Sequence, residues 1–213
     1  MSIEAFERLP EEKKAAIIAA GVREFAKKSF SDASTDVITA GCGISKGLLF
    51  HYFGSKRAFY LYCLETALKR LVTKTPLPHA SNFYTILFGV LDDKFRLCRE
   101  YPEETQFVNM ASRDACSEVI SERRGVFAKY MEVTSAASDE VMARAVAMLP
   151  LKNPEDPSAG KALRLYVNTL INRYLILYRE TPDVFFRNAD VVKAELKRDI
   201  DFMLHGICKE VLE

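Results

Sequence analysis

The feature that most constrains the fold is a glycine-bearing break between two short segments suited to helices. Gly41-Cys42-Gly43 separates a segment that begins near Ser34 from one that begins after Ser45. Serine is a favoured N-cap residue, and glycine adopts the backbone conformations that tight turns require. Two short helices joined by such a turn, with a longer helix packed across them, predict a helix-turn-helix over residues 34–53.

The remainder of the chain also has the pattern of helices. We find no convincing alternation typical of a strand, and the prolines fall at intervals suited to a helical bundle. The pattern predicts an all-α fold of about nine helices, with an N-terminal three-helix head and a C-terminal helical body. Besides the two short ones, helices are expected over about 10–28, 56–74, 82–100, 102–113, 117–149, 158–179 and 189–212.

The composition excludes several classes of protein. Apolar residues make up 49% of the chain and charged residues 28%, values typical of an ordered globular protein. No apolar run is long enough for a membrane span, and acidic residues occupy the place of a basic signal-peptide segment, so we expect a cytoplasmic protein. The five cysteines and three histidines are dispersed, so no metal site, cofactor or disulfide framework is expected.

The second motif helix has the properties needed to enter a DNA groove. Such a helix needs small residues at its N-terminus, apolar anchors on one face and side chains that reach bases on the other. Ile44, Leu49 and Phe53 are the expected anchors. The expected outer face consists of Lys46, Leu48, Phe50, His51 and Tyr52.

The segment from Gly43 to Lys56 resembles the recognition-helix motif of the tetracycline-repressor (TetR) family, close to G-V-S-K-G-T-L-Y-x-H/Y-F-x-S-K. The resemblance covers about residues 10–65, and the body shows only compatible architecture. It implies an all-helical homodimeric regulator that binds double-stranded DNA. Carried onto this sequence, it implies that Ser34 or Thr35, Ser45, Lys46, Gly47 and Lys56 contact phosphates, and that His51 and Tyr52 face the groove or the backbone.

Three residues depart from the family pattern. Thr39 replaces a small alanine in the middle of the first motif helix, Leu48 replaces a threonine and Phe50 replaces a tyrosine. Leu48 suits contact with a thymine methyl group, whereas Phe50 lacks a hydroxyl group for phosphate. These changes bear on the sequence preference of the protein.

The resemblance also implies a division of labour along the chain. Residues 1–54 would bind DNA, residues 55–75 would connect, and residues 76–213 would bind ligand and dimerise. Residues 1–75 carry four more basic than acidic residues, and the remainder carries three more acidic ones. This modest asymmetry fits a DNA-binding head.

The body contains many apolar and aromatic residues that fit two interpretations. One is a pocket for an apolar or amphipathic effector, and the other is ordinary core packing. The pocket candidates are Phe88, Phe95, Phe107, Met110, Phe127, Tyr130, Tyr166 and Asn168.

The last two long helices are expected to form the homodimer interface. Each carries an apolar stripe, and two such helices from each subunit would make a four-helix contact. The candidate interface residues are Leu163, Leu170, Ile200, Met203 and Ile207.

The leading hypothesis is therefore a repressor that a small effector releases from a palindromic operator. A DNA-binding regulator without an inducer is the alternative. A helical enzyme is a third class, but we find no nucleophile–base pair, phosphate-binding glycine loop or metal spacing, so no catalytic residue is expected.

Overall fold

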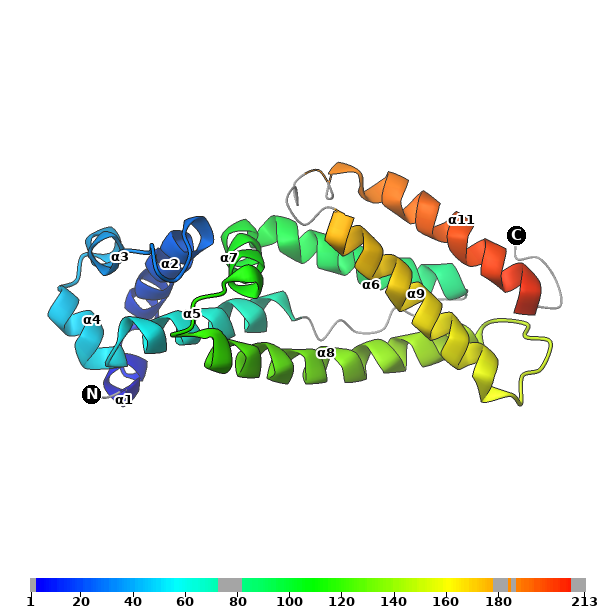
Figure 1. Ribbon diagram of the computed structural model, residues 1–213, viewed down its shortest axis with the longest axis horizontal. Coiled ribbons are helices and arrows are strands. Elements are labelled where there is room, and N and C mark those ends of the chain that lie inside the picture. The colour runs from blue at the N-terminus through cyan, green and yellow to red at the C-terminus, as the bar shows by residue number, and fades with distance from the viewer. Residues whose placement is uncertain (1–2, 73–81, 178–183, 185–186, 208–213) are drawn as a thin grey trace. The chain divides into compact units, whose positions relative to one another are not determined.

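The computed structural model describes residues 3–72, 82–177, 184 and 187–207, and its secondary structure is helical (Figure 1). The predicted all-α class is confirmed, and none of the described helices has the length and apolarity needed to cross a membrane. The helices are α1 (Ile3–Glu7), α2 (Glu11–Lys27), α3 (Thr35–Cys42), α4 (Lys46–Phe53), α5 (Lys56–Leu71), α6 (Phe83–Glu100), α7 (Pro102–Arg113), α8 (Ile120–Ala147), α9 (Pro157–Leu177) and α11 (Ala189–Ile207).

The chain forms two compact units. Unit 1 contains Met1–Thr73 and Glu100–Thr134, and unit 2 contains Lys74–Arg99 and Ser135–Glu213. Unit 1 therefore includes α7 and the first part of α8 in addition to the predicted head. The functional division, with DNA binding by residues 1–54 and with ligand binding and dimerisation by residues 76–213, stays a prediction.

The core of unit 1 is built largely from aromatic rings. Phe25 of α2 packs against Tyr60 of α5 and Phe107 of α7, with ring centroids 4.9 and 5.5 Å away, and these two rings also contact each other. Phe53 at the end of α4 lies 4.7 Å from Phe59 of α5. Aromatic pairs at these separations add to the stabilisation from buried area. This packing joins four helices in one core.

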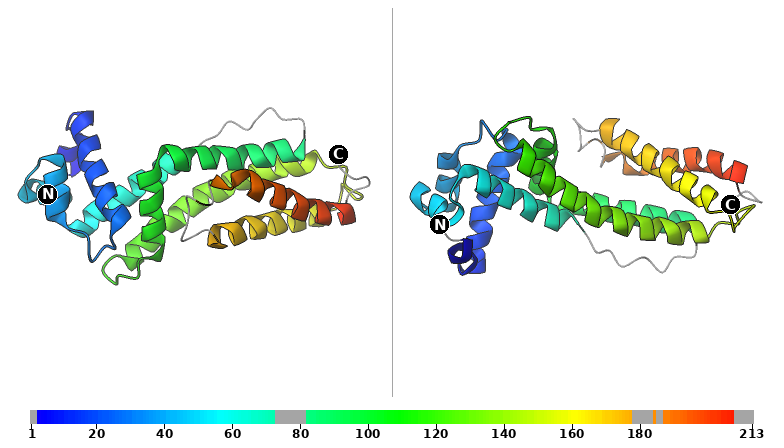
Figure 2. Two further views of the ribbon diagram at one scale, coloured as in Figure 1. Left: turned by 90° about the horizontal axis from the view of Figure 1, so that it is seen from above. Right: turned by 60° about the horizontal axis from the view of Figure 1, so that its bottom comes forward.

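The α7 helix packs against α2 and α5 (Figures 1 and 2). Ion pairs join it to both helices: Glu103 lies 3.2 Å from Arg23 of α2, and Glu104 lies 2.5 Å from Arg70 of α5. At its end, the Asp114 carboxylate accepts a 2.7 Å hydrogen bond from the Phe30 amide. The α7 helix is thus attached to the segment that leads into α3.

Unit 2 has its own core between α6, the last turns of α8, α9 and α11. Leu163 and Ile200 are fully buried there, and α9 lies beside α11 (Figure 2). Polar contacts also fix α11: Tyr84 of α6 donates a hydrogen bond to Asp201, and Tyr174 of α9 donates one to Glu195 at 2.7 Å. The inner face of α11 is therefore used within the subunit.

The α2 and α5 helices approach each other closely at Gly21 in the middle of α2. A Cβ atom built there would lie 2.6 Å from the Phe59 ring and 2.8 Å from the Cys63 sulfur atom of α5. Glycine is unfavourable inside a helix, so its presence here is explained by this contact. The short distance between α2 and α5 at this point is possible because glycine has no side chain.

We expect Gly21→Ala to lower the free energy of unfolding by about 1–3 kcal/mol, because overpacking forces neighbours to shift. Gly125→Ala in α8 is the matched control, since its Cβ would meet nothing within 4 Å. That change should stabilise the protein by about 0.5–1 kcal/mol through helix propensity. Urea unfolding measures both, and equal effects of the two substitutions would contradict the close approach.

Candidate nucleic-acid interface

The start of α3 is fixed by a serine cap and a buried carboxylate. The Ser34 hydroxyl accepts a hydrogen bond from the Val37 amide at 3.4 Å, as expected for an N-cap. The Ser34 amide in turn donates to the Glu24 carboxylate of α2 at 2.9 Å, and Lys28 lies 3.1 Å from the same oxygen. The position of α3 is therefore tied to α2.

The two threonines of α3 face inward. Thr35 and Thr39 are buried, and the Thr39 hydroxyl donates a 2.9 Å hydrogen bond to the Thr35 carbonyl. The departure at Thr39 is therefore accommodated by a hydrogen bond within α3. Of the two alternatives expected to contact phosphate, Ser34 and Thr35, the second has its side chain in the interior of unit 1.

The turn between α3 and α4 depends on Gly43. Its φ of 68° lies in the left-handed region, where a side chain is costly, and its amide donates to the Thr39 carbonyl. The Ile44 amide donates to the same carbonyl at 3.1 Å. These bonds end α3 and set the direction in which α4 begins.

The α4 helix has one buried face. Leu49 is fully buried, and Phe53 packs against Phe6 of α1 at a centroid distance of 4.8 Å. The partly buried Ile44 also packs against this core. The predicted anchors of the second motif helix are therefore in the positions expected.

The opposite face of α4 is open at its N-terminal end. The Ser45 hydroxyl accepts a 3.1 Å hydrogen bond from the Leu48 amide and caps the helix. Phe50 is half-buried, and the Lys46 ammonium group lies 3.0 Å from the Asp36 carboxylate of α3. The exposed side of α4 consists of Ser45, Lys46, Gly47, Leu48 and His51.

Tyr52 is placed differently from the other residues expected to face DNA. It is only 9% exposed, and its ring packs edge-on against Phe6 at 5.7 Å. The reason is α1, which sequence reasoning missed because it started the first helix at Pro10. Phe6 at i+3 from Ile3, before the Pro10 boundary, is the signal that points to such a helix.

Lys56 lies against the loop between α2 and α3. Its ammonium group donates a 3.3 Å hydrogen bond to the Ser31 carbonyl and lies 4.8 Å from the centre of the Phe30 ring. Ser55 caps α5 by accepting from the Ala58 amide at 3.1 Å. To contact a phosphate, Lys56 must therefore either break its hydrogen bond to the Ser31 carbonyl or donate to both groups.

The predicted effector residues are divided between the two units. Phe107, Met110, Phe127 and Tyr130 belong to unit 1, where Phe107 is fully buried in the aromatic core. The other four belong to unit 2: Phe95 is buried, Phe88 and Tyr166 are half-buried, and Asn168 is exposed on α9. In the part of the chain that the structure describes, no cluster of three or more acidic, histidine or cysteine residues is arranged for a metal ion.

The predicted dimer residues lie mainly on inner faces. Leu163, Leu170 and Ile200 are buried in the unit 2 core, and Met203 packs against it while half-buried. The side chain of Ile207 lies outside the described residues. Other apolar residues of the same helices are exposed, and Phe202 is the most exposed of them at 84%.

Comparisons with known proteins agree with the geometry of this interface. Residues 17–63 match the family model described as bacterial regulatory proteins, tetR family. The uncharacterized HTH-type transcriptional regulator YerO of Bacillus subtilis is 44% identical over 54 residues, which are 25% of this chain and 19% of that relative. The helix-turn-helix region of this chain is therefore similar to the corresponding region of TetR-family regulators.

Solved structures of TetR-family proteins extend the likeness to the whole fold. A TetR-family transcriptional regulator from Chloroflexus aurantiacus has a TM-score of 0.59 and 22% identity, with 97% of this chain and 98% of that one covered. The flavonoid-responsive regulator FrrA has a TM-score of 0.57 and 20% identity, with 94% and 100% covered. At these identities, the comparison of the body concerns the fold alone.

The charge of Glu24 should stabilise the start of α3. Burial raises the pKa of this carboxyl, but the Ser34 amide and the Lys28 ammonium group outweigh burial and hold the pKa below its usual range. A group with a lowered pKa in the folded state stabilises the fold at neutral pH, and this stabilisation is lost as the pH falls through that pKa.

We expect Glu24→Gln to cost about 1 kcal/mol at pH 7, because a charge-assisted hydrogen bond is replaced by a neutral one. Urea unfolding at pH 7 and pH 3 should show a difference from wild type that shrinks at the lower pH. The exposed Glu118 offers a matched control, and Glu118→Gln should have little effect at either pH. A pH-independent cost of Glu24→Gln would contradict the role of the charge.

Proposed function

We propose that this protein is a TetR-family transcriptional repressor that binds a palindromic DNA operator as a homodimer and is released by a small apolar or amphipathic effector. The observation that carries the proposal is the exposed N-terminal end of α4, held in place by buried anchors on the opposite face. Ser45, Lys46, Gly47 and Leu48 are exposed at this end, while Leu49 is fully buried.

The first turn of α4 suits contact with phosphate. Amide groups at a helix N-terminus lack intrahelical acceptors and carry the positive end of the helix dipole. Gly47 leaves space, since its Cβ would meet only the Ser45 hydroxyl, at 3.9 Å. A phosphate group could therefore approach the backbone closely, with Ser34 and Lys56 as flanking contacts.

Base reading is assigned to the exposed residues that follow. Leu48 is suited to a thymine methyl group, and His51 offers a ring nitrogen to a base edge or phosphate. Phe50 is half-buried, and Tyr52 could contribute only its hydroxyl group because its ring packs on α1. The proposed reading face is thus smaller than the sequence alone suggested.

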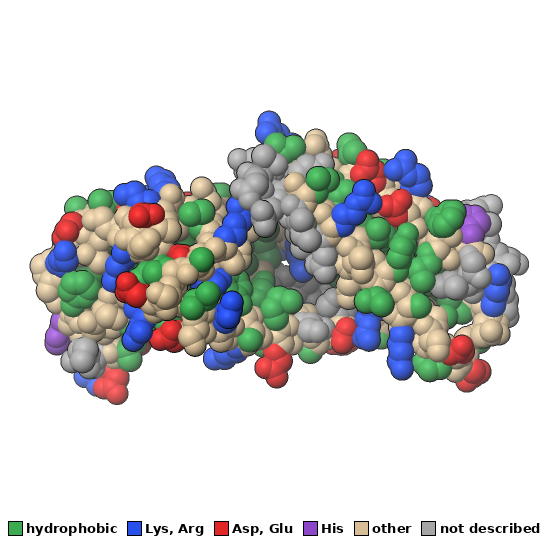
Figure 3. Space-filling view, in the orientation of Figure 1, with side chains coloured by type: hydrophobic (Ala, Val, Ile, Leu, Met, Phe, Trp, Pro, Cys, Tyr) green, Lys and Arg blue, Asp and Glu red, His purple; other side chains and the backbone are tan. Residues whose placement is uncertain are grey.

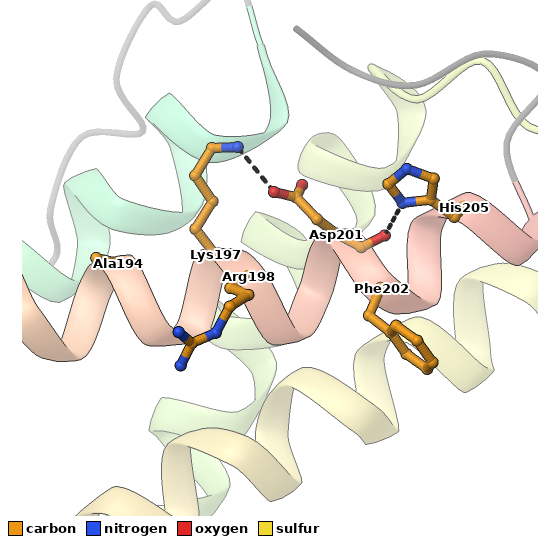
Figure 4. Close-up of a pocket in the computed structure, with 6 residues that line it drawn as sticks. All are labelled: Ala194, Lys197, Arg198, Asp201, Phe202 and His205. Carbon is orange, nitrogen blue, oxygen red and sulfur yellow. Dashed lines mark hydrogen bonds and ion pairs between the residues drawn. The ribbon is translucent and has the colours of Figure 1, made fainter.

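We place the dimer interface on the outer faces of α9 and α11. Leu165 on α9 is 71% exposed, and Phe202 on α11 is 84% exposed. Hydrophobic side chains reach the surface over these helices (Figure 3), and Arg198 and Phe202 lie on the side of α11 opposite Lys197 and Asp201 (Figure 4). Large exposed apolar groups on long helices favour association with a second copy.

A cleft in unit 2 is the candidate site for the effector. The cleft, of about 430 Å³, lies between the end of α8, the following loop and the start of α9, with Met142, Val146, Leu151 and Arg164 in its lining. This volume is in the range of small-molecule sites. The name of FrrA, a flavonoid-responsive regulator, supports an effector of this general kind. The packed core around Phe95 favours the alternative, a regulator without an inducer.

Gly47→Glu should reduce DNA affinity at least about tenfold, because like charges brought together on binding cost several kcal/mol. The Glu side chain has space at this position, and a carboxylate is favourable near a helix N-terminus, so the fold should be retained. Fluorescence anisotropy with duplexes from the promoter nearest its own gene measures the effect, and added effectors would lower the bound fraction.

Gly125→Glu is the matched control for this substitution, since it adds the same charge to another open helical glycine of unit 1. Its affinity for DNA should stay within about twofold of wild type, as expected for a surface change away from the contact. Equal loss in both variants, or no specific binding by the wild type at low salt, would overturn the DNA-binding assignment.

Phe202→Glu should convert the dimer into a monomer and weaken operator binding, because a buried charge at the interface has no partner. Sedimentation velocity measures the state of association, and circular dichroism reports whether the subunit stays folded. Met131→Glu, at a residue of α8 that is 59% exposed, should remain dimeric. A dimeric Phe202→Glu variant with wild-type DNA affinity would refute this interface.

A further inference from the structure

An ion pair crosses the turn of the helix-turn-helix. The Lys46 ammonium group on the first residue of α4 lies 3.0 Å from the Asp36 carboxylate in the first turn of α3. Asp36 is 73% exposed and Lys46 is 49% exposed at their side chains, so both face solvent. The pair is therefore located on the surface that the proposed function assigns to DNA.

The positions of the two charges differ in their helix environments. Asp36 lies at the positive end of the α3 dipole, which favours a carboxylate there. Lys46 lies at the positive end of α4, where a cation is unfavourable without a neighbouring anion. Asp36 supplies that anion when the protein is free. A DNA phosphate near Lys46 would take over the same role.

We propose that Asp36 offsets the charge of Lys46 and so lowers both the affinity of the protein for DNA and the steepness of its salt dependence. The inference depends on the proposed DNA-binding function. A phosphate that approaches Lys46 also approaches the Asp36 carboxylate, at a separation shorter than the screening length of about 8 Å at physiological salt. The attraction to Lys46 is therefore partly cancelled on every duplex.

The cancellation acts in the same way on operator and non-operator DNA. Binding to arbitrary sequence depends almost wholly on phosphate neutralisation and counterion release. Operator binding adds contacts to base edges from residues such as Leu48 and His51, whereas the ion pair of Asp36 is with Lys46. Removing the carboxylate should therefore strengthen binding to both kinds of DNA by a similar factor.

Asp36→Asn tests this inference in the full-length protein, with anisotropy titrations on a random-sequence duplex and on the promoter duplex. One further effective phosphate contact per subunit steepens the loss of affinity between 50 and 200 mM salt by about 3.5-fold per subunit. We expect this steeper salt dependence and an affinity raised by about threefold or more at low salt on both duplexes, with a similar preference for the promoter.

Two further comparisons separate the effect of this pair from a general change in charge. Glu140→Gln removes an exposed carboxylate of unit 2 and should leave the salt dependence unchanged. Lys46→Gln should cost little in the wild type and several-fold more in the Asp36→Asn background. Circular dichroism melting checks that each variant is folded.

The outcomes distinguish the two proposals. A wild-type protein that binds no duplex at low salt overturns the proposed function and this inference together. A wild type that binds, with an Asp36→Asn variant of unchanged or lower affinity and unchanged salt dependence, overturns the inference alone. An equal cost of Lys46→Gln in both backgrounds would also refute it.

Discussion

The burial of Leu49 and Phe53 determines which side of α4 faces solvent. Leu49 is fully buried, and Phe53 contacts aromatic rings of both α1 and α5. A helix of this length has little stability by itself, so tertiary packing rather than helix propensity maintains it. With these two residues inside, helical periodicity leaves the N-terminal turn and one outer stripe exposed.

Polar contacts complement this packing by joining consecutive segments. Glu24 holds the start of α3, Asp114 holds the segment before it, and Lys56 donates to the Ser31 carbonyl in the same loop. In α5, the Tyr62 hydroxyl donates a 2.6 Å hydrogen bond to Glu7 of α1. Burial together with this bond raises the pKa of Tyr62. Each bond satisfies a group near a helix boundary, where backbone and side-chain partners are otherwise incomplete.

Local patterns explain how much of this arrangement could be predicted from the sequence. Ser45 and Ser55 cap the helices that follow them, and Gly43 has the left-handed conformation expected of a helix-ending glycine. These features depend on neighbouring residues only. The all-α class could be predicted for the same reason, because local caps and breakers largely determine where helices begin and end.

Long-range contacts explain what could not be predicted. Tyr52 is buried because α1 supplies Phe6, a contact between residues distant in the sequence. Likewise, the stripes that contain Leu163 and Ile200 fit either a subunit core or a dimer contact, and periodicity does not distinguish the two. The pairing of Asp36 with Lys46 also required the direction of the turn at Gly43.

The contact at Gly21 has a mechanical consequence. Since the Phe59 ring and the Cys63 sulfur atom leave no space for a Cβ atom at that point, α2 and α5 are closely packed there. Closely packed interiors are stiff and pass displacements on rather than absorbing them. The α4 helix is joined to this packing through Phe53 and Phe59. Under the proposed function, we therefore expect a signal that alters DNA binding to move α2, α4 and α5 together.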